Sequence, residues 1–344
     1  MLGANHSGET MDITVILCTH NRAEDLAKAL ESVAASEMPN SITWEVFVVD
    51  NNSNDQTRVL VEAFCRRYPG RFRYLLEPRP GKSFALNTGI RESQGDVLAF
   101  MDDDVTVCPA WLRNLTGALH TDEWAGAGGR IILQWPSSLP PWLAVDGPYA
   151  RHCFPGFDQG QEAKALIGPP FGTNMAFRRE MFDKYGVFRT DLGPSACKDI
   201  PPHSEDTEFG RRLIAGGERL RYEPSAIVYH PVSESRINKA YFLRWRFDLG
   251  RADIRALGIQ PGTKWFVRGI PLYLFRRLAV WTSRWMVSIE PSRRFFHKVK
   301  AWEQAGAISE CHRLHTMKNE KVDVMLRSDS AQAGSRPPYD YRML

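Results

Sequence analysis

The sequence predicts an α/β protein built around an open, mostly parallel β-sheet. Between residues 13 and 104, short apolar runs rich in β-branched residues alternate with amphipathic helical patterns. The apolar runs end in clusters of polar residues. In open parallel sheets, ligands bind beyond the carboxyl ends of the strands. The coincidence of polar clusters with strand ends is therefore the first indication of a functional site.

The individual elements follow from these runs in chain order. Strands are predicted at Ile13–Cys18, Trp44–Val49, Phe72–Leu76 and Val97–Met101. Helical patterns occupy Ala23–Ala35, Thr57–Tyr68 and Phe84–Ser93. Later segments are a loop at Trp135–Gly160, a loop entering a strand at Gly168–Arg179, a helix at Ser204–Ala215 and a strand within Leu220–Pro231. We expect Ser204 to cap its helix, because serine is favoured at that position.

Composition limits the possible classes of protein. The 344 residues suffice for a large domain and an appendage, and the net charge of +4 does not demand a nucleic-acid partner. The six cysteines include no C-x-x-C pair, which predicts neither a zinc site nor a disulfide framework and favours a reducing, cytoplasmic compartment. We expect residues 1–10 to be a mobile leader rather than a signal peptide, and we expect no membrane-spanning helix.

Asp102, Asp103 and Asp104 directly follow a fully apolar strand. Three adjacent carboxylates repel one another, and a bound cation would neutralise that repulsion. Because side chains alternate along an extended segment, we expect Asp102 and Asp104 to face the same side. Hard oxygen ligands suit Mg²⁺ or Mn²⁺, ions that also bridge diphosphate oxygens. The alternative is an acidic turn without a ligand.

Three further features give weaker signals. Glu205 and Asp206 begin a predicted helix, where acidic side chains also serve the helix dipole. His230 ends a strand, which is equally typical of a histidine at the domain boundary. Gly81 opens a loop in which Lys82 and backbone N–H groups could meet phosphate, although the spacing of a P-loop is missing.

In their order and spacing, these pieces resemble the family 2 glycosyltransferases. The matching stretches are ITVILCTHNR, FVVDNNSNDQT, GKSFALNTGI, GDVLAFMDDDV, GTNMAFRREMF, SEDTEFGRRL and AIVYHP. They extend from residue 13 to about residue 232. The resemblance implies the GT-A fold, a Rossmann-like sheet flanked by helices, over residues 11–235.

The resemblance also implies a role for each matching residue. Those expected to bind the nucleotide-sugar donor are Thr19, Arg22, Asp50, Lys82, Asp102, Asp103 and Asn174. Thr19 and Arg22 lie where the family's first loop touches the nucleoside. Asp50 lies where a carboxylate reads the base, and Asp102 lies where the first aspartate of the D-x-D motif meets ribose. Asn174 lies in the segment that lines the donor sugar and the acceptor.

The reacting centre is implied in the same way. Asp104 lies at the metal ligand of the D-x-D motif, His230 where a histidine often approaches the metal, and Asp206 at the catalytic base. The metal would act as a Lewis acid on the leaving diphosphate, and the base would take the proton of the acceptor hydroxyl. One base with in-line displacement implies inversion at the anomeric carbon. Asn51 replaces the second Asp of many members, which leaves the nucleobase open, and UDP is expected because it is common in the family.

Two other classes of protein remain as alternatives. A sugar nucleotidyltransferase shares an α/β plan and a metal, but it would place a glycine-rich phosphate loop where this chain has CTHNR. A non-catalytic sugar- or nucleotide-binding protein would not need the aspartate cluster, Asp206 and His230 together. Slow hydrolysis of sugar nucleotides in the presence of Mn²⁺ would distinguish these classes.

The last third of the chain is predicted to be a helical appendage at 236–326, followed by a disordered tail at 327–344. Apolar residues recur at helical spacing at Val267, Ile270, Leu274, Leu278, Trp281, Trp285 and Ile289. Between Lys264 and Lys300 there are nine Lys or Arg and one acid, Glu290, a local charge of +8. This pattern suits an anionic membrane surface on the cytoplasmic side and a lipid-linked acceptor. The alternative is that the stripe packs on the catalytic domain and the basic residues are solvated.

Overall fold

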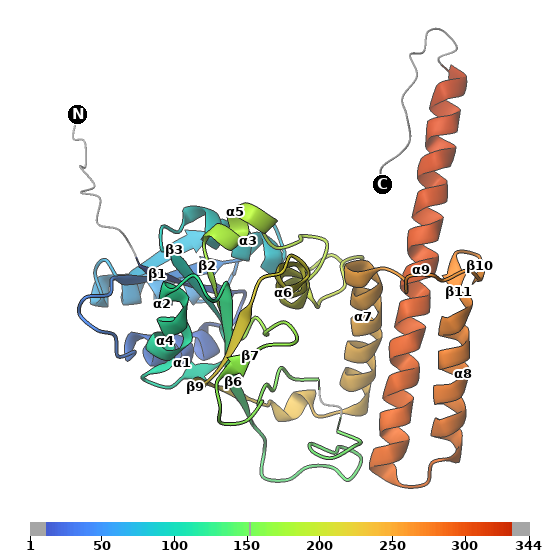
Figure 1. Ribbon diagram of the computed structural model, residues 1–344, viewed down its shortest axis with the longest axis horizontal. Coiled ribbons are helices and arrows are strands. Elements are labelled where there is room, and N and C mark those ends of the chain that lie inside the picture. Colours follow the sequence, from blue (N-terminus) through green and yellow to red (C-terminus); the bar gives the residue numbers. More distant parts are fainter. Residues whose placement is uncertain (1–11, 151–152, 332–344) are drawn as a thin grey trace.

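The protein consists of an α/β domain followed by a layer of three long helices (Figure 1). The structure is a computed structural model that describes residues 12–150 and 153–331, with residues 318–331 described as backbone only. The predicted leader at 1–10 lies outside the described residues, as does the part of the predicted tail at 332–344. The predicted α/β class is confirmed.

The described residues of the α/β domain form one nine-stranded sheet. Its strands are β1 (Ile13–Thr19), β2 (Trp44–Asp50), β3 (Phe72–Leu76), β4 (Val97–Asp102), β5 (Thr106–Val107), β6 (Gly126–Gln134), β7 (Lys164–Ala165), β8 (Asn174–Arg178) and β9 (Leu220–Pro231). The order is β3-β2-β1-β4-β8-β6-β9-β5, with β7 paired to β9. β1 to β4 are parallel, and β8 is antiparallel to its neighbours β4 and β6. The carboxyl ends of β1, β2 and β4 therefore lie together at one edge.

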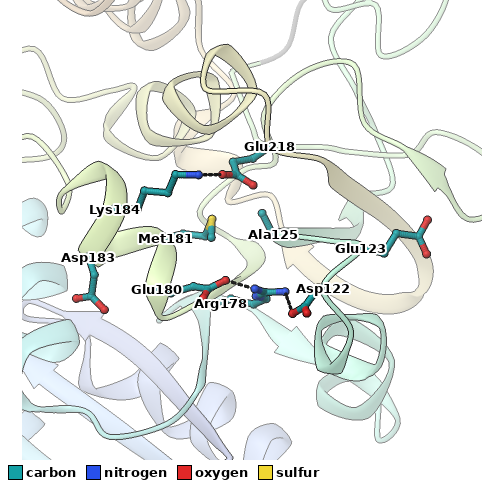
Figure 2. Close-up of a pocket in the computed structure, with 9 residues that line it drawn as sticks. All are labelled: Asp122, Glu123, Ala125, Arg178, Glu180, Met181, Asp183, Lys184 and Glu218. Carbon is teal, nitrogen blue, oxygen red and sulfur yellow. Dashed lines mark hydrogen bonds and ion pairs between the residues drawn. The ribbon is translucent and has the colours of Figure 1, made fainter.

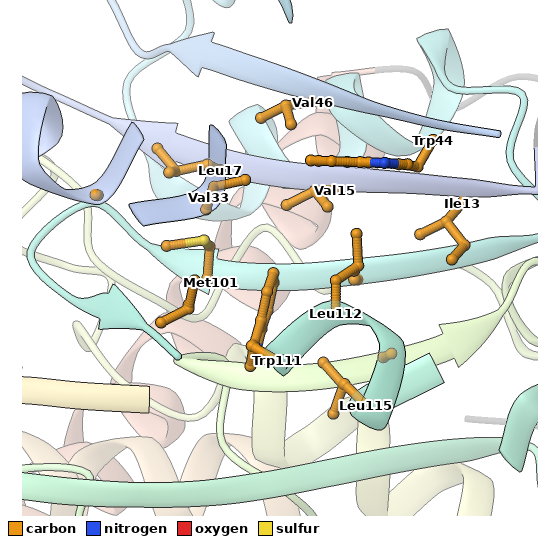
Figure 3. Packing of buried hydrophobic residues seen from close by; sticks show 14 of the residues in the cluster. Ile13, Val15, Leu17, Val33, Trp44, Val46, Met101, Trp111, Leu112 and Leu115 are labelled. Atoms are coloured by element: carbon orange, nitrogen blue, oxygen red, sulfur yellow. The ribbon is translucent and has the colours of Figure 1, made fainter. Parts of the chain in front are cut away.

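Helices cover both faces of this sheet. The helices are α1 (Ala23–Ala34), α2 (Thr57–Arg67), α3 (Lys82–Glu92), α4 (Trp111–Thr116), α5 (Glu180–Tyr185), α6 (Glu205–Ala215), α7 (Lys239–Leu257), α8 (Leu272–Val287) and α9 (Pro291–Ala331), with 3₁₀ turns η1 (Gly117–His120) and η2 (Glu234–Arg236). Val15 and Leu17 pack with α1 and α4 (Figure 3) and with α2, whereas Ile16 and Phe100 pack with α3, α5 and α6. Burial on both faces explains why these strands are continuous apolar runs.

Most of the predicted strands and helices are confirmed, but β6 was not predicted. Its first half reads GAGG, and glycine is unfavourable in strands. The glycines are needed because neighbours approach closely: a Cβ on Gly126 would lie 2.3 Å from Phe177 Cδ1, and one on Gly129 would lie 2.3 Å from Asn174 Nδ2. The expected cap at Ser204 is wrong. Ser204 is left-handed (φ 76°) and its hydroxyl makes no capping hydrogen bond, whereas a capping serine needs an extended backbone.

The C-terminal region is helical as predicted, except for a short hairpin. The hairpin consists of β10 (Phe266–Val267) and β11 (Ile270–Pro271), so the predicted stripe does not begin on a helix. α8 starts only after Pro271, which sits at its N-cap position. α9 continues to Ala331, past the predicted end of the helical region at residue 326. None of the helices in the described part of the chain has the length and apolar content needed to cross a bilayer.

The apolar stripe of α8 packs inside the appendage. Leu274 is buried, Trp281 lies 6.0 Å from Phe296 between ring centroids, and Trp285 lies 6.2 Å from Trp302. Both partner rings belong to α9. Trp281 and Trp285 therefore pack against α9, whereas Val267 and Ile289, at the two ends of the predicted stripe, are exposed.

A buried charged cluster fastens this appendage to the α/β domain. Glu310 of α9 is fully buried and pairs with Arg251, Arg255 and Arg313 at 3.2, 2.5 and 2.6 Å. Arg255 also donates hydrogen bonds to the carbonyls of Asp191 and Asp199, at 2.9 and 2.6 Å. Both carbonyls belong to the loop that leads into α6. The position of this loop is thus tied to α7 and α9.

Candidate active site

The site lies at the carboxyl ends of the parallel strands. Thr19 ends β1 opposite Asp50 of β2, and Cys18 is opposite Asp102 of β4. Thr19 is buried, and its carbonyl accepts a hydrogen bond from Asn51 N at 2.8 Å. The sheet therefore brings together three of the strand-end clusters that the sequence predicted to be functional.

Lys82, the first residue of α3, lies between two acids. Its Nζ is 2.6 Å from Asp102 Oδ1 and 3.6 Å from Glu205 Oε1. Burial opposes the charge on Lys82, but the two carboxylates outweigh it and raise the pKa of Lys82 well above its usual value. Burial would likewise raise the pKa of Asp102, but Lys82 and a 2.7 Å hydrogen bond from Thr173 Oγ1 lower it to about 2. Lys82 is thus a charged group at neutral pH.

The two following aspartates share an arginine. Arg22 Nη1 is 3.0 Å from both Asp103 Oδ1 and Asp104 Oδ2. The chain turns after Asp102 instead of continuing as a strand, so the strict alternation expected for Asp102 and Asp104 does not hold. Burial raises the pKa of Asp103 to about 6, although Arg22 opposes the shift. Arg236 of η2 also approaches Asp104 Oδ2, at 3.7 Å.

Asp104 and His230 form a pair that fits a divalent cation. His230 Nε2 is 3.8 Å from Asp104 Oδ1, and its Nδ1 is 3.0 Å from the carbonyl of Pro231. Because a carbonyl only accepts, this hydrogen bond assigns the proton to Nδ1 and leaves the Nε2 lone pair facing Asp104. Within the described residues, no group of three or more His, Cys, Asp or Glu could hold an ion. Two protein ligands are nevertheless enough for Mg²⁺ or Mn²⁺ when substrate phosphates complete the shell.

Asp206 faces a different loop from its neighbour Glu205. Asp206 Oδ2 accepts a hydrogen bond from Gly172 N at 2.6 Å, and Oδ1 accepts one from Thr207 N at 2.7 Å. A Cβ on residue 172 would lie only 3.0 Å from Asp206 Oδ2, so glycine permits this approach. Glu205 is buried, whereas Asp206 is half-buried. Burial and repulsion from Asp206 raise the pKa of Glu205 to about 7. Asp206 is therefore the acid that a substrate can reach.

Comparison with known proteins decides the family. A sequence model described as Glycosyl transferase family 2 matches residues 14–186, half of the chain. The chain is a family 2 glycosyltransferase. The match includes Lys82 and the aspartate cluster, but it ends before Asp206 and His230. The evidence that these two residues belong to the site is therefore their hydrogen bonds and distances given above, and not the family match.

Relatives and solved structures agree with this assignment. The glycosyltransferase is 31% identical to the succinoglycan biosynthesis protein ExoM of Rhizobium meliloti, over 72% of this chain and 76% of that protein. It is 27% identical to the glucosyl-dolichyl phosphate glucuronosyltransferase of Haloferax volcanii, over 66% and 71%. Its fold matches the mannosyltransferase PcManGT from Pyrobaculum calidifontis, solved with GDP-Man and Mn²⁺, with a TM-score of 0.53, 17% identity and coverage of 94% and 81%. The expected GT-A fold is confirmed.

In this glycosyltransferase, Asn174 is not at the surface of the site. It is fully buried, its Oδ1 accepts a hydrogen bond from Trp111 Nε1 at 2.9 Å, and its Nδ2 donates to the carbonyls of Arg130 and Ala226 at 3.0 and 2.8 Å. The predicted contact of Asn174 with the donor sugar is therefore wrong. Its amide instead joins β8 to β6, β9 and α4.

The side chains of Asp50 and Asn51 make hydrogen bonds to different segments of the protein. Both oxygens of Asp50 accept hydrogen bonds, from Ser53 N and from the Tyr74 hydroxyl, each at 2.8 Å. Asn51 donates to the carbonyls of Glu77 and Arg79 at 3.0 and 2.7 Å. Asn51 Oδ1 also accepts from the backbone N–H of the loop glycine at position 81, at 2.7 Å. An aspartate could not donate the two bonds to these carbonyls. The asparagine that replaces the family's second Asp at position 51 therefore orders the loop that leads to α3.

Two residues near the site were not predicted from the sequence. Thr173 lies inside the GTN stretch that was recognised, and its hydrogen bond to Asp102 could have been suspected there. Arg236 follows β9 in a segment without periodicity, so no local pattern marks it. Only the structure shows that η2 places the guanidinium of Arg236 near Asp104.

One hollow in the structure does not coincide with this site. It has a volume of about 530 Å³ and lies at the opposite edge of the sheet, where Arg178 pairs with Val97 at the start of β4. Figure 2 shows that acids engage both of its basic side chains: Arg178 pairs with Asp122 and Glu180, and Lys184 with Glu218. The acids that line this hollow outnumber its two basic residues, so it offers no free cation to an anionic ligand, and we assign the function to the carboxyl edge instead.

Proposed function

We propose that this glycosyltransferase transfers a sugar, with inversion, from a nucleotide diphosphate to a hydroxyl acceptor, using Mn²⁺ or Mg²⁺. The observation that carries the proposal is the position of Gly172 and Thr173. These adjacent residues hydrogen-bond Asp206 on one side and Asp102 on the other. The proposed base and the proposed donor site are therefore held by one short segment, as a single displacement requires.

The donor side of the proposal rests on the basic residues around the aspartates. Lys82, Arg22 and Arg236 point their cationic groups at the aspartate cluster. A diphosphate bound there would meet these cations, while Asp102 and Asp50 would contact ribose and base, with uracil as the proposed base. Asp104 and His230 would hold the metal ion, which acts as a Lewis acid toward the diphosphate when bound.

The acceptor side rests on Asp206. Two backbone N–H groups fix the orientation of its carboxylate, and each oxygen keeps a lone pair that can accept the proton of an attacking hydroxyl. A single base is sufficient for inversion, because no covalent sugar–enzyme intermediate has to be formed.

We further propose a saccharide acceptor that is carried on a lipid at the cytoplasmic face of a membrane, in polysaccharide or glycoconjugate biosynthesis. Support comes from the names of two relatives, one a succinoglycan biosynthesis protein and one an enzyme that acts on a glucosyl-dolichyl phosphate. The strongly basic segment between Lys264 and Lys300 is consistent with such a location.

The test is a donor screen with UDP-, GDP- and dTDP-sugars, in which metal-dependent thermal stabilisation and slow sugar-nucleotide hydrolysis are measured. We expect UDP-sugars to stabilise the protein only with Mn²⁺ or Mg²⁺. Asp104→Ala should remove the metal dependence, whereas Asp122→Ala, in the distant hollow, should retain it. Formation of a nucleoside triphosphate from sugar nucleotide and pyrophosphate would identify a nucleotidyltransferase instead. Binding without any turnover would identify a sugar-binding protein.

A further inference from the structure

The appendage exposes an apolar face that the packed stripe of α8 does not use. Large apolar side chains on this face are exposed along the hairpin, along α8 and into the turn after it. They are Trp265, Phe266, Val267, Leu272, Phe275, Val280, Met286, Val287 and Ile289. We call these nine residues the α8 outer face. Several are almost fully exposed: Trp265 by 73%, Val287 by 77% and Ile289 by 94%.

For the five of these residues that belong to α8, helical position places the side chains opposite α9. On α8, Leu272, Phe275, Val280, Met286 and Val287 follow helical spacing, offset by about half a turn from the buried stripe around Leu274. In Figure 1, α9 lies between α7 and α8, so α8 is the outermost helix of the appendage. A helix with apolar residues on both sides is typical of one that contacts something beyond its own chain.

Basic side chains accompany this face, and no acid on α8 balances them. Arg276, Arg277 and Arg284 are exposed, and none of them forms an ion pair in the part of the chain whose side chains are described. Arg277 and Arg284 instead lie over the rings of Tyr273 and Trp281, at 5.1 and 5.0 Å from the centroids. The face therefore combines exposed apolar groups with unneutralised positive charge.

We propose that the α8 outer face lies flat on the surface of an anionic phospholipid membrane. Apolar side chains would enter the interface while the neighbouring arginines contact lipid phosphates. Charge decides against a second copy of this chain as the occupant. In a symmetric pair, Arg276 and Arg277 would lie close to the same arginines of the other copy and repel them. The inference deepens the proposed function, since it rests on a lipid-linked acceptor, but it is tested separately.

The experiment is co-sedimentation of the full chain with vesicles of phosphatidylcholine alone, or of phosphatidylcholine with phosphatidylglycerol, at low and high salt. We expect binding only to the anionic vesicles, and we expect salt to weaken it. Replacing Arg276, Arg277 and Arg284 with Gln should weaken the partition roughly a hundredfold. The matched control replaces three exposed arginines of the catalytic domain, Arg66, Arg73 and Arg113, with Gln, which should leave binding unchanged.

A second pair of variants tests the apolar contribution. Met286→Glu combined with Val287→Glu should release the protein from vesicles, whereas Val59→Glu, at an exposed position of α2, should not. Because Met286, Val287 and Val59 are all at least 60% exposed, these variants should keep the wild-type melting temperature. The measurement of slow sugar-nucleotide hydrolysis in the same samples should give wild-type rates.

Each other outcome overturns one proposal and not the other. If the folded wild-type protein does not bind anionic vesicles but hydrolyses the donor, only the proposal of a membrane-binding surface is overturned. Vesicle binding without hydrolysis or transfer overturns the proposed function alone. A stable dimer in solution that dissociates on Met286→Glu would show that a second copy covers the face, and would also overturn the membrane surface.

Discussion

Two buried charged clusters in this protein have opposite compositions. At the active site, five carboxylates (Asp102, Asp103, Asp104, Glu205 and Asp206) face three basic side chains (Lys82, Arg22 and Arg236). Around Glu310, one carboxylate faces three arginines. Asp248 also pairs with one of these arginines, Arg251. The first cluster therefore has more acids than basic side chains, and the second has more basic side chains than acids.

The pKa shifts follow from this difference. The pKa of Glu205 is raised to about 7 and the pKa of Asp103 to about 6, because burial and neighbouring acids disfavour the charged forms of both side chains. Burial also acts on Glu310, but its bonds to Arg313 and Arg255 lower the pKa instead. A surplus of acid is costly for a fold and is useful for binding cations, whereas a neutralised cluster serves mainly to fix a structure. The following predictions test this distinction.

The largest effect is expected on transfer when Asp206 is changed to Asn. The amide keeps the size of the side chain but cannot take the proton of the acceptor, so transfer should fall on the order of 10²-fold or more. Donor binding should stay close to wild type, while the melting temperature should fall slightly, because the amide can accept only one of the two backbone hydrogen bonds that the carboxylate accepts. Transfer rates with a soluble acceptor, compared with donor-induced stabilisation, provide the measurement. Transfer within about threefold of wild type would remove Asp206 from its proposed role and make Glu208 the next candidate.

Glu310→Gln should act in the opposite way, on stability and not on chemistry. The change leaves Arg255 and Arg313 without a negative partner, while Arg251 keeps its ion pair with Asp248, and it should cost about 3 kcal/mol in the free energy of unfolding. Because the pKa of Glu310 is lowered in the folded state, its contribution is present at neutral pH and is lost as the pH falls below the unfolded value. Denaturant unfolding at pH 7 and pH 4 measures both effects. Equal destabilisation at both pH values would contradict the ionic role.

Glu205→Gln should change the pH dependence of stability. Folding raises the pKa of Glu205 from 4.5 to about 7, so between these values the folded state holds a proton that the unfolded state has lost. Stability due to this group therefore falls as the pH rises through that window, by on the order of 1–3 kcal/mol. The Gln variant should lack this loss. Its stability relative to wild type should therefore be greater at pH 8 than at pH 5. Melting curves across this range, with Glu208→Gln as the control, check the prediction.

The smallest effect is expected for Asn51→Asp, at the edge of the active-site cluster. The carboxylate cannot donate to the carbonyls of Glu77 and Arg79, so the loop before α3 should lose about 1–2 kcal/mol of stability. Donor affinity should weaken with it, since Lys82 follows this loop. Affinity that improves in Asn51→Asp would show that position 51 contacts the nucleotide instead of ordering the loop.

The sequence predicts the first half of the fold well, because strands buried on both faces are continuous apolar runs. β6 escaped prediction because close packing against Phe177 and Asn174 demands glycines that weaken a strand pattern. Asn174 was assigned to the donor sugar because a polar residue in a recognised motif looks accessible, whereas its three bonds inside the protein depend on distant segments. Periodicity also indicated an apolar stripe in this region, but it could not show that α9 packs against it.

The stacking of α7, α9 and α8 has a consequence for the length of an acceptor. If the α8 outer face lies on a membrane, three helix diameters of about 10 Å each separate the lipid surface from the α/β domain. Asp206 would then stand on the order of 30 Å above the headgroups. A single sugar attached to a lipid phosphate would be too short to reach that height. The enzyme would accept only chains that earlier transferases had already lengthened, and would therefore act late in the assembly of its product.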